Sequence, residues 1–140
     1  MLSHCKILVT GASSGIGQAS AKVFALHGAQ VFGTGRNLMA LELMKEEKHL
    51  VGFSAGDLTS SGTPEEIVNS AVESMGGLTT VVNAAGVLRG GAMGTVDLEN
   101  FQFNFAANVQ TTFEVMQHAI PHLKKQSEQS PSIINISSVN

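Results

Sequence analysis

Short apolar runs alternate along the chain with longer segments in which apolar residues recur at helical spacing. The runs are rich in Ile, Val, Leu and Phe without polar alternation, and they fall at residues 6–9, 29–32, 50–53, 80–82 and 132–136. Such runs are typical of strands buried on both faces, as in a parallel sheet. The pattern therefore predicts five buried strands with helices between them.

Helix starts and ends mark the first two intervening segments. Residues 15–27 carry one apolar stripe and stop at Gly28, a residue type that readily adopts the left-handed conformation that ends helices. Asn37 is a candidate N-cap for a second helix over residues 38–48. Both segments are therefore expected to be helical.

Two further helical regions follow. The sequence TPEE predicts a helix start with Thr63 as the cap and proline at the first helical position. Asp97 is a candidate cap for a helical segment that continues, after a break, through residues 108–125, and Pro121 inside it predicts a kink. Polar residues 124–130 predict a surface loop before the last strand.

Repeated strand-helix-strand units place the strands parallel, with helices on both faces of the sheet. The predicted fold class is therefore α/β, a doubly wound (Rossmann-like) parallel sheet, with residues 1–140 as a single domain. Ligands of such sheets bind beyond the carboxyl ends of the strands, near the switch in strand order. The residues at these ends are Gly11, Gly35, Asp57, Asn83 and Ser138.

The amino-acid composition argues against two classes of binding partner, nucleic acid and membrane. With a formal charge of -3 and 43% hydrophobic residues, the chain has no basic surplus that would attract nucleic acid. No apolar stretch approaches the roughly 20 residues that span a bilayer, and the N-terminus lacks a secretion signal, so no membrane partner is expected.

Cysteine and histidine usage argues against a disulfide or a metal site. Cys5 is the single cysteine, which excludes an intrachain disulfide and favours a reducing, cytoplasmic location. His118 and His122 have the spacing of a metal-binding pair on a helix, but no third ligand accompanies them and Pro121 distorts the turn. We therefore expect no metal.

The sequence TGASSGIG follows the first apolar run. A glycine-rich turn between a strand and a helix presents backbone N–H groups and the positive end of the helix dipole to an anion. Gly11 permits a tight exit from the strand, Gly15 allows close approach of a pyrophosphate, and Gly17 lets the helix pack against the sheet. Ser13 and Ser14 add hydroxyl donors. The loop predicts a dinucleotide site, with a merely flexible turn as the alternative.

The end of the second strand bears on the choice of dinucleotide. A carboxylate at this place accepts hydrogen bonds from the adenine ribose of NAD(H), but the sequence has Gly35 there, followed by Arg36. Nothing repels a 2'-phosphate, and a guanidinium is available to pair with it. The prediction is NADP(H) over NAD(H), with a solvated surface arginine as the alternative.

Together these motifs resemble the N-terminal part of the short-chain dehydrogenase/reductase family. The landmarks are TGASSGIG at residues 10–17, GDL at 56–58, NAAG at 83–86, Asn108, and INISS at 134–138. They occur in the family's order and at its spacings over the whole chain. The resemblance implies hydride transfer between a nicotinamide dinucleotide and a small carbonyl or alcohol substrate.

The resemblance also implies residue roles at the cofactor. Asp57 would accept from the adenine amino group, although it could instead cap the turn at residues 57–59, and Asn83 and Gly86 would belong to the sheet-stabilising element beside the cofactor ribose. Many NADP(H)-preferring members carry a basic residue where this chain has Ser14. The implied cofactor-binding residues are Gly11, Ser13, Ser14, Gly15, Ile16, Gly17, Arg36, Asp57, Leu58, Asn83 and Gly86.

Only half of the family's catalytic set is present. By resemblance Ser138, with Ser137 as a fallback, would polarise the substrate oxygen, and Asn108 would hold a water in the proton path. The family's proton-exchanging tyrosine and its lysine would lie beyond residue 140, and the chain contains no tyrosine. The sequence therefore predicts a domain truncated after the fifth strand and inactive as it stands.

Two structural expectations and two alternative functions complete the interpretation of the sequence. The helix at residues 108–125, with an apolar face at Phe113, Met116 and Ile120, implies a homo-oligomer by resemblance, and the last strand is expected to have an open edge. A non-catalytic nucleotide-binding regulatory or interaction module is the alternative function. A methyltransferase is a third, disfavoured because its fold places an acid where Gly35 stands.

Overall fold

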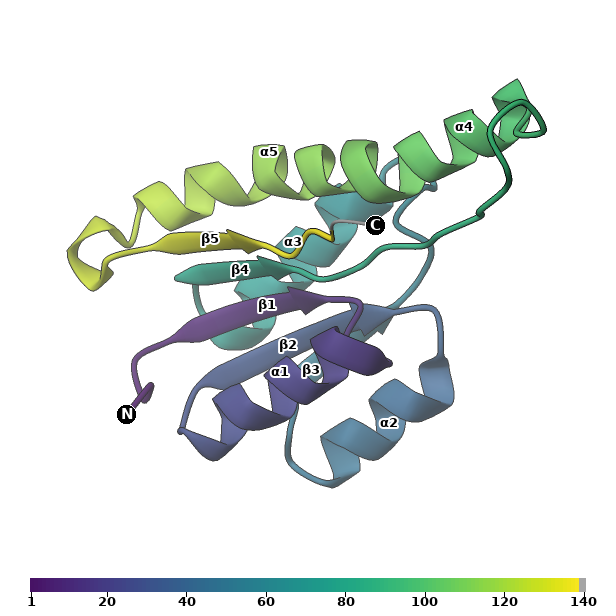
Figure 1. The fold of residues 1–140 in the computed structure, drawn as a ribbon. Coiled ribbons are helices and arrows are strands. Elements are labelled where there is room, and N and C mark those ends of the chain that lie inside the picture. The colour runs from purple at the N-terminus through teal and green to yellow at the C-terminus, as the bar shows by residue number, and fades with distance from the viewer. Residues whose placement is uncertain (139–140) are drawn as a thin grey trace.

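The computed structural model describes residues 1–138 and contains one five-stranded, all-parallel sheet (Figure 1). The strand order is β3-β2-β1-β4-β5, so the chain starts in the middle of the sheet and builds outward first on one side and then on the other. This confirms the predicted doubly wound, Rossmann-like class. The strands are β1 (Lys6–Thr10), β2 (Gln30–Gly35), β3 (Gly52–Ala55), β4 (Thr80–Asn83) and β5 (Ser132–Asn135).

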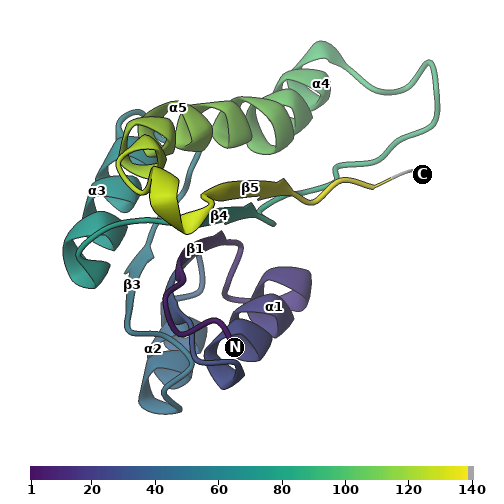
Figure 2. The ribbon, with the colours of Figure 1, turned by 90° about the vertical axis from the view of Figure 1, so that its left-hand side faces the viewer.

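Helices cover both faces of the sheet, as Figure 2 shows in edge view. Two helices, α1 and α2, lie on one face, and α3 and α5 lie on the other, with α4 extending the line of α5 (Figure 1). The elements are α1 (Gly15–Leu26), α2 (Leu38–Glu46), α3 (Thr63–Met75), α4 (Leu98–Phe105), the π-helix η1 (Ala106–Gln110), α5 (Thr111–Lys124) and the 3-10 turn η2 (Ser127–Gln129).

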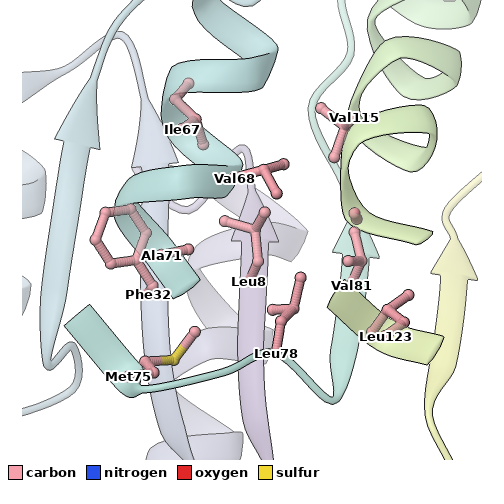
Figure 3. Close-up of a cluster of buried hydrophobic side chains, with 11 residues drawn as sticks. Leu8, Phe32, Ile67, Val68, Ala71, Met75, Leu78, Val81, Val115 and Leu123 are labelled. Atoms are coloured by element: carbon pink, nitrogen blue, oxygen red, sulfur yellow. The ribbon is translucent and has the colours of Figure 1, made fainter. Parts of the chain in front are cut away.

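Two buried clusters explain why the strands lack polar alternation. Leu8 on β1 points toward α3 and α5, in a cluster that includes Ile67 and Val115 (Figure 3). Its neighbours Ile7 and Val9 point to the opposite face, where they join the cluster under α1 and α2. Because each face of the sheet is covered, successive residues of one strand are both buried and both must be apolar.

All five predicted strands are present, but β2 and β3 lie further along the chain than the apolar runs at residues 29–32 and 50–53. β2 continues through Gly33, a residue type that is depleted in strands. A Cβ on Gly33 would lie 2.9 Å from the Ala12 Cβ and from Leu50. The strand therefore uses glycine there because the neighbouring loop packs directly on it.

Two of the three predicted helix N-caps are confirmed and one is wrong. Asn37 and Asp97 each accept a hydrogen bond from the backbone N–H three residues on, at 3.1 and 2.8 Å, as predicted. The prediction that Thr63 caps its helix is wrong. Gly62 is the cap, with a φ of 82°, and Thr63 is already helical, with proline in the first turn. The left-handed bend that starts this helix needs glycine rather than a hydroxyl side chain.

The predicted break between the two long helical segments is a π-helical turn rather than an interruption. The Thr111 N–H bonds to the carbonyl of Ala106, five residues back. Side chains take over two nearby carbonyls: Thr111 Oγ1 donates to Ala107 O at 2.8 Å and Thr112 Oγ1 to Asn108 O at 3.2 Å. The helix then continues through Pro121 to Lys124.

Exposed apolar side chains are found at the outer edge of the sheet and on the long helix, among other places. At the β5 edge, Ile134 and Ile136 are each 43% exposed. On the long helix, Phe113 is exposed as expected, but Met116 and Ile120 are half-buried. The exposed stripe extends instead toward the helix start, and its residues are Leu98, Phe101, Phe105, Val109 and Phe113.

None of the helices in residues 1–138 has the length and apolar character to cross a bilayer. No group of three or more His, Cys, Asp or Glu side chains in that range is placed to hold a metal ion.

We predict that Leu8→Ala lowers the free energy of unfolding by about 2–5 kcal/mol, because it leaves a cavity among fully buried side chains. Urea denaturation followed by far-UV circular dichroism measures the change. Leu26→Ala, at a 75% exposed leucine, is the matched control and is expected to change stability by about 0.5 kcal/mol or less. Equal losses from both variants would contradict the proposed core.

Candidate functional site

A cleft of about 270 Å³ opens beyond the carboxyl ends of β1 to β4. Nine of the eleven predicted cofactor residues line it, namely Gly11, Ser13, Ser14, Gly15, Ile16, Arg36, Asp57, Leu58 and Gly86. The remaining lining residues are Gly35, Gly56, Thr59, Ala84, Ala85, Val87, Phe103, Ala107 and Thr111. The topology thus gathers four separate loops and one helix around a single concave site.

The glycine loop forms the base of the cleft. Gly11 and Gly15 have φ values of 70° and 52°, in the left-handed region that favours glycine. A Cβ on Gly17 would overlap the carbonyl of Gly11, so only glycine lets α1 pack this close to the loop. Gly17 is accordingly buried and lies behind the cleft wall. These two conformations and this close contact explain three of the glycines in the motif.

The N-terminus of α1 is open to an anion. Its first turn contains no acidic residue, and the side chain of its N-cap, Ser14, makes no capping hydrogen bond. No atom lies within 4 Å of the place where a Cβ on Gly15 would stand. Unpaired N–H groups and an uncompensated positive dipole therefore face the cleft, as a phosphate site requires.

Gly35 is sterically constrained to lack a side chain. A Cβ on Gly35 would overlap Ser13 Oγ and lie 2.8 Å from Ser13 Cβ. The backbone N–H of Ala12 holds the loop against β2 by donating to Thr34 O at 2.8 Å. This packing leaves no room for a carboxylate at residue 35. Arg36, the next residue, lines the cleft and is exposed.

Asp57 is held in a tight turn. Its Oδ1 accepts from the Thr59 backbone N–H at 2.9 Å and from Thr59 Oγ1 at 2.7 Å. These two hydrogen bonds, first the backbone one, lower the pKa of Asp57 and outweigh the opposing effect of burial, and the Arg36 charge adds a still smaller lowering. Asp57 therefore caps the turn, the alternative that the sequence left open, while still lining the cleft.

Asn83 lies within the sheet rather than in the cleft. It is 3% exposed, and its Nδ2 donates to Asn135 Oδ1 at 2.9 Å, which ties the end of β4 to β5. Gly86, further along, does line the cleft, and a Cβ there would lie 2.9 Å from Asn108 Oδ1. Gly86 is thus pressed between the cleft and the long helix.

Asn108 uses its side chain to hold the chain after β4. Its Oδ1 accepts from the Val87 N–H at 2.9 Å, and its Nδ2 donates to Val87 O at 2.8 Å and to Asn104 O at 2.9 Å. The side chain does not line the cleft, and the residue lies in the π-helical turn. Its amide group is therefore already occupied by protein partners.

The candidate serines lie apart from the cleft lining. Ser137 and Ser138 follow β5, and both are exposed. Neither belongs to the residues that line the cleft, and no hydrogen bond within residues 1–138 joins them to Asn108. Their predicted role in polarising a substrate oxygen stays a prediction.

The long helix contributes a wall of the cleft that no sequence motif predicted. Phe103, Ala107 and Thr111 all line the cleft. They are spaced four residues apart, which places them on one face of a helix. That spacing is a usable signal, but the apolar residues around it also suit ordinary packing, so the sequence alone does not separate the two.

Comparisons with known proteins agree with this geometry. Residues 6–140 match the sequence profile of the family described as short chain dehydrogenase. The chain is 37% identical over 136 residues to the 2,5-dichloro-2,5-cyclohexadiene-1,4-diol dehydrogenase LinX of Sphingobium indicum, covering 94% of this chain and 54% of that protein. It is 32% identical to an uncharacterized oxidoreductase of Staphylococcus epidermidis, covering 95% of this chain and 57% of that one. The chain thus spans about half the length of these relatives.

Solved structures share the fold of this chain. An actinorhodin polyketide ketoreductase with NADPH superposes with a TM-score of 0.86 at 27% identity, over 99% of this chain and 55% of that one. An NADH-dependent reductase complexed with NAD superposes with a TM-score of 0.83, also at 27% identity, over 99% of this chain and 62% of that one.

We predict that Asp57 makes stability depend on acid pH. Its pKa is lower in the folded chain than the ordinary 3.8, so its contribution is full above pH 3.8 and is lost as the pH falls below that value toward the folded pKa. Asp57→Asn removes this part of the pH dependence. The pH dependence is measured from the urea midpoints of both proteins at pH values from about 2.5 to about 6, a range that covers the titration of an aspartate. Parallel pH profiles for the two proteins would contradict the prediction.

Proposed function

We propose, since the chain belongs to the short chain dehydrogenase family, that it is the NADP(H)-binding N-terminal part of an oxidoreductase. In the complete protein a hydride would move between the nicotinamide and a small carbonyl or alcohol substrate. The observation that carries this proposal is the cleft itself, where the glycine loop and the open end of α1 face the same space as Arg36 and Asp57.

The cleft fits a nicotinamide dinucleotide. The N–H groups at the start of α1 would hold the pyrophosphate, with the hydroxyls of Ser13 and Ser14 beside them. Asp57 and Leu58 would meet the adenine, and Gly86 leaves room for the ribose on the β4 side. The cofactor would supply the hydride chemistry, and these residues would bind and orient it.

The preference for NADP(H) rests on residues 35 and 36. Because the loop packing excludes any side chain at Gly35, no carboxylate is available for a free ribose 2'-hydroxyl. The exposed Arg36 guanidinium at the cleft can pair with a 2'-phosphate instead. Relatives of known structure bind either NADPH or NAD, so the preference depends on this chain's own residues.

The catalytic proposal keeps two residues in their expected roles. Ser138 would polarise the substrate oxygen. Asn108 would hold the water through its main-chain carbonyl, because its side-chain amide is bonded to Val87 and Asn104. That carbonyl oxygen accepts from Thr112 Oγ1 at 3.2 Å with one lone pair, and its second lone pair would accept from the water. The chain contains no tyrosine to exchange the proton, so the 140-residue polypeptide is proposed to bind cofactor without turnover.

A non-catalytic nucleotide-binding regulatory or interaction module, which would use the same cleft to hold a nucleotide, is the second candidate. In either case we propose a homo-oligomer that covers the exposed stripe on α4, η1 and α5, where Phe101, Phe105 and Phe113 are each more than half exposed. The cytoplasmic location remains an expectation from the single cysteine.

We predict that Arg36→Ala raises the dissociation constant for NADPH by about ten- to a hundredfold, the value of one charge-assisted contact of about 1.5–3 kcal/mol. The dissociation constant for NADH should change by about twofold or less. Titration followed by nicotinamide fluorescence measures both.

Lys125→Ala is the matched control for the loss of one positive charge, because Lys125 is an exposed residue at the end of α5 outside the cleft lining. It should leave both affinities unchanged. Equal weakening of NADPH and NADH by Arg36→Ala would contradict the assignment of Arg36 to the 2'-phosphate. Binding of neither dinucleotide by the unmodified chain would overturn the proposed function.

We also predict that the 140-residue chain oxidises no NADPH above the rate without protein, with any of a panel of aldehydes and ketones. The physical reason is the missing general acid, a group that contributes about 10²–10⁴-fold. Loss of NADPH absorbance measures the rate, with a complete family member as the positive control. Carbonyl-dependent turnover that Ser138→Ala abolishes would show that this chain needs no tyrosine.

A further inference from the structure

The segment after β4 is held on the long helix by two asparagine side chains. Val87 exchanges two hydrogen bonds with Asn108, donating to Oδ1 at 2.9 Å and accepting from Nδ2 at 2.8 Å. In the same way, the Arg89 backbone N–H donates to Asn104 Oδ1 at 3.0 Å, and the Arg89 carbonyl accepts from Asn104 Nδ2 at 3.1 Å. Each amide therefore pairs with one residue's N–H and C=O, as a neighbouring β-strand would.

The spacing of the two asparagines along the helix matches the spacing of their two partners along the segment. Residues 104 and 108 are four apart on a helix, which separates them by about 6 Å along the axis. Residues 87 and 89 are two apart on an extended chain, which separates them by about 6.6 Å. The helix can therefore present its amides in register with alternate residues of the segment, and the described strands provide no backbone partner for residues 84–97.

Both amides are oriented by further contacts. Asn104 Nδ2 also donates to Asn100 O at 2.9 Å and to Asn100 Oδ1 at 3.0 Å, and Asn108 Nδ2 donates to Asn104 O at 2.9 Å. These contacts place the donor and acceptor sides of each amide toward the matching backbone group. The arrangement is thus a connected polar network, in which loss of one member affects the others.

The network reaches the cleft at two lining residues of the same wall. Val87 lines the cleft directly. The guanidinium carbon of Arg89 lies 3.4 Å from the ring centre of Phe103, and Phe103 also lines the cleft. Holding the Arg89 backbone therefore also keeps a cation stacked on that ring. A displacement of residue 89 would therefore affect both of these lining residues.

We propose that Asn104 is a positioning residue for the cleft wall at Val87 and Phe103. The proposal rests on the proposed dinucleotide site. Asp57 and Arg36 follow β3 and β2, whereas Val87 follows β4 on the other side of β1. A dinucleotide that places its adenine near Asp57 therefore places its nicotinamide half near Val87, so Asn104 acts on that half alone.

The test compares Asn104→Ala with the unmodified chain by two measurements. Amide hydrogen exchange should rise by at least about tenfold at both Val87 and Arg89. The dissociation constant for NADPH should rise by about tenfold, while that for 2',5'-ADP, which lacks the nicotinamide half, should stay within about twofold. Asn104→Asp keeps the acceptor for the Arg89 N–H, so it should retain protection at Arg89 and weaken NADPH less.

Gln110→Ala is the matched control, because the Gln110 side chain also forms an amide hydrogen bond four residues along this helix, to Glu114 at 2.8 Å, but Gln110 is not one of the residues that line the cleft. It should change neither measurement. Unchanged exchange at Val87 in Asn104→Ala, or equal weakening of NADPH and 2',5'-ADP, would overturn the proposal. If the unmodified chain binds neither ligand, the proposed function fails, and exchange at Val87 still decides whether Asn104 holds the wall.

Discussion

The structure depends on how closely the loop after β1 packs against its neighbours. A Cβ on Gly11 would lie 2.8 Å from the Ala84 carbonyl oxygen, and one on Gly35 would overlap Ser13. Backbone therefore meets backbone on the β4 side of the central strand, and on the β2 side the Ser13 side chain packs against Gly35. Neither glycine position has room for a side chain of its own. The same contacts that close the centre of the sheet also leave N–H groups of the loop and of α1 facing the cleft.

The two sides of the cleft are built by different physical means. On the β2 and β3 side, missing side chains and the Asp57 turn shape a surface suited to phosphate and adenine. On the β4 side, an extended segment that has no strand partner is satisfied by helix side-chain amides from Asn104 and Asn108. The π-helical turn lies at this point, where side chains replace part of the regular hydrogen bonding.

Sequence reasoning succeeded where one local rule acts alone. Asn37 and Asp97 cap their helices because the requirement is a side-chain acceptor within three residues. It failed where a neighbour distant in sequence decides. β2 continues through Gly33 because the strand pairs with β1 and β3 on either side and a loop packs on it. The N-cap of α3 is Gly62, in the left-handed conformation, and not Thr63.

The amino-acid sequence by itself determined the alternation of buried strands and helices, the parallel sheet and the glycine loop of the cleft, because periodicity and glycine spacing are local properties of the chain. Family resemblance, rather than a local rule, pointed to Leu58 and Gly86. The tertiary structure alone decided that Asn83 serves the sheet, that the amide of Asn108 is occupied, and that Asn104 and Phe103 support the wall. These roles depend on which groups meet across 15 to 52 residues of chain, and no local pattern encodes that meeting.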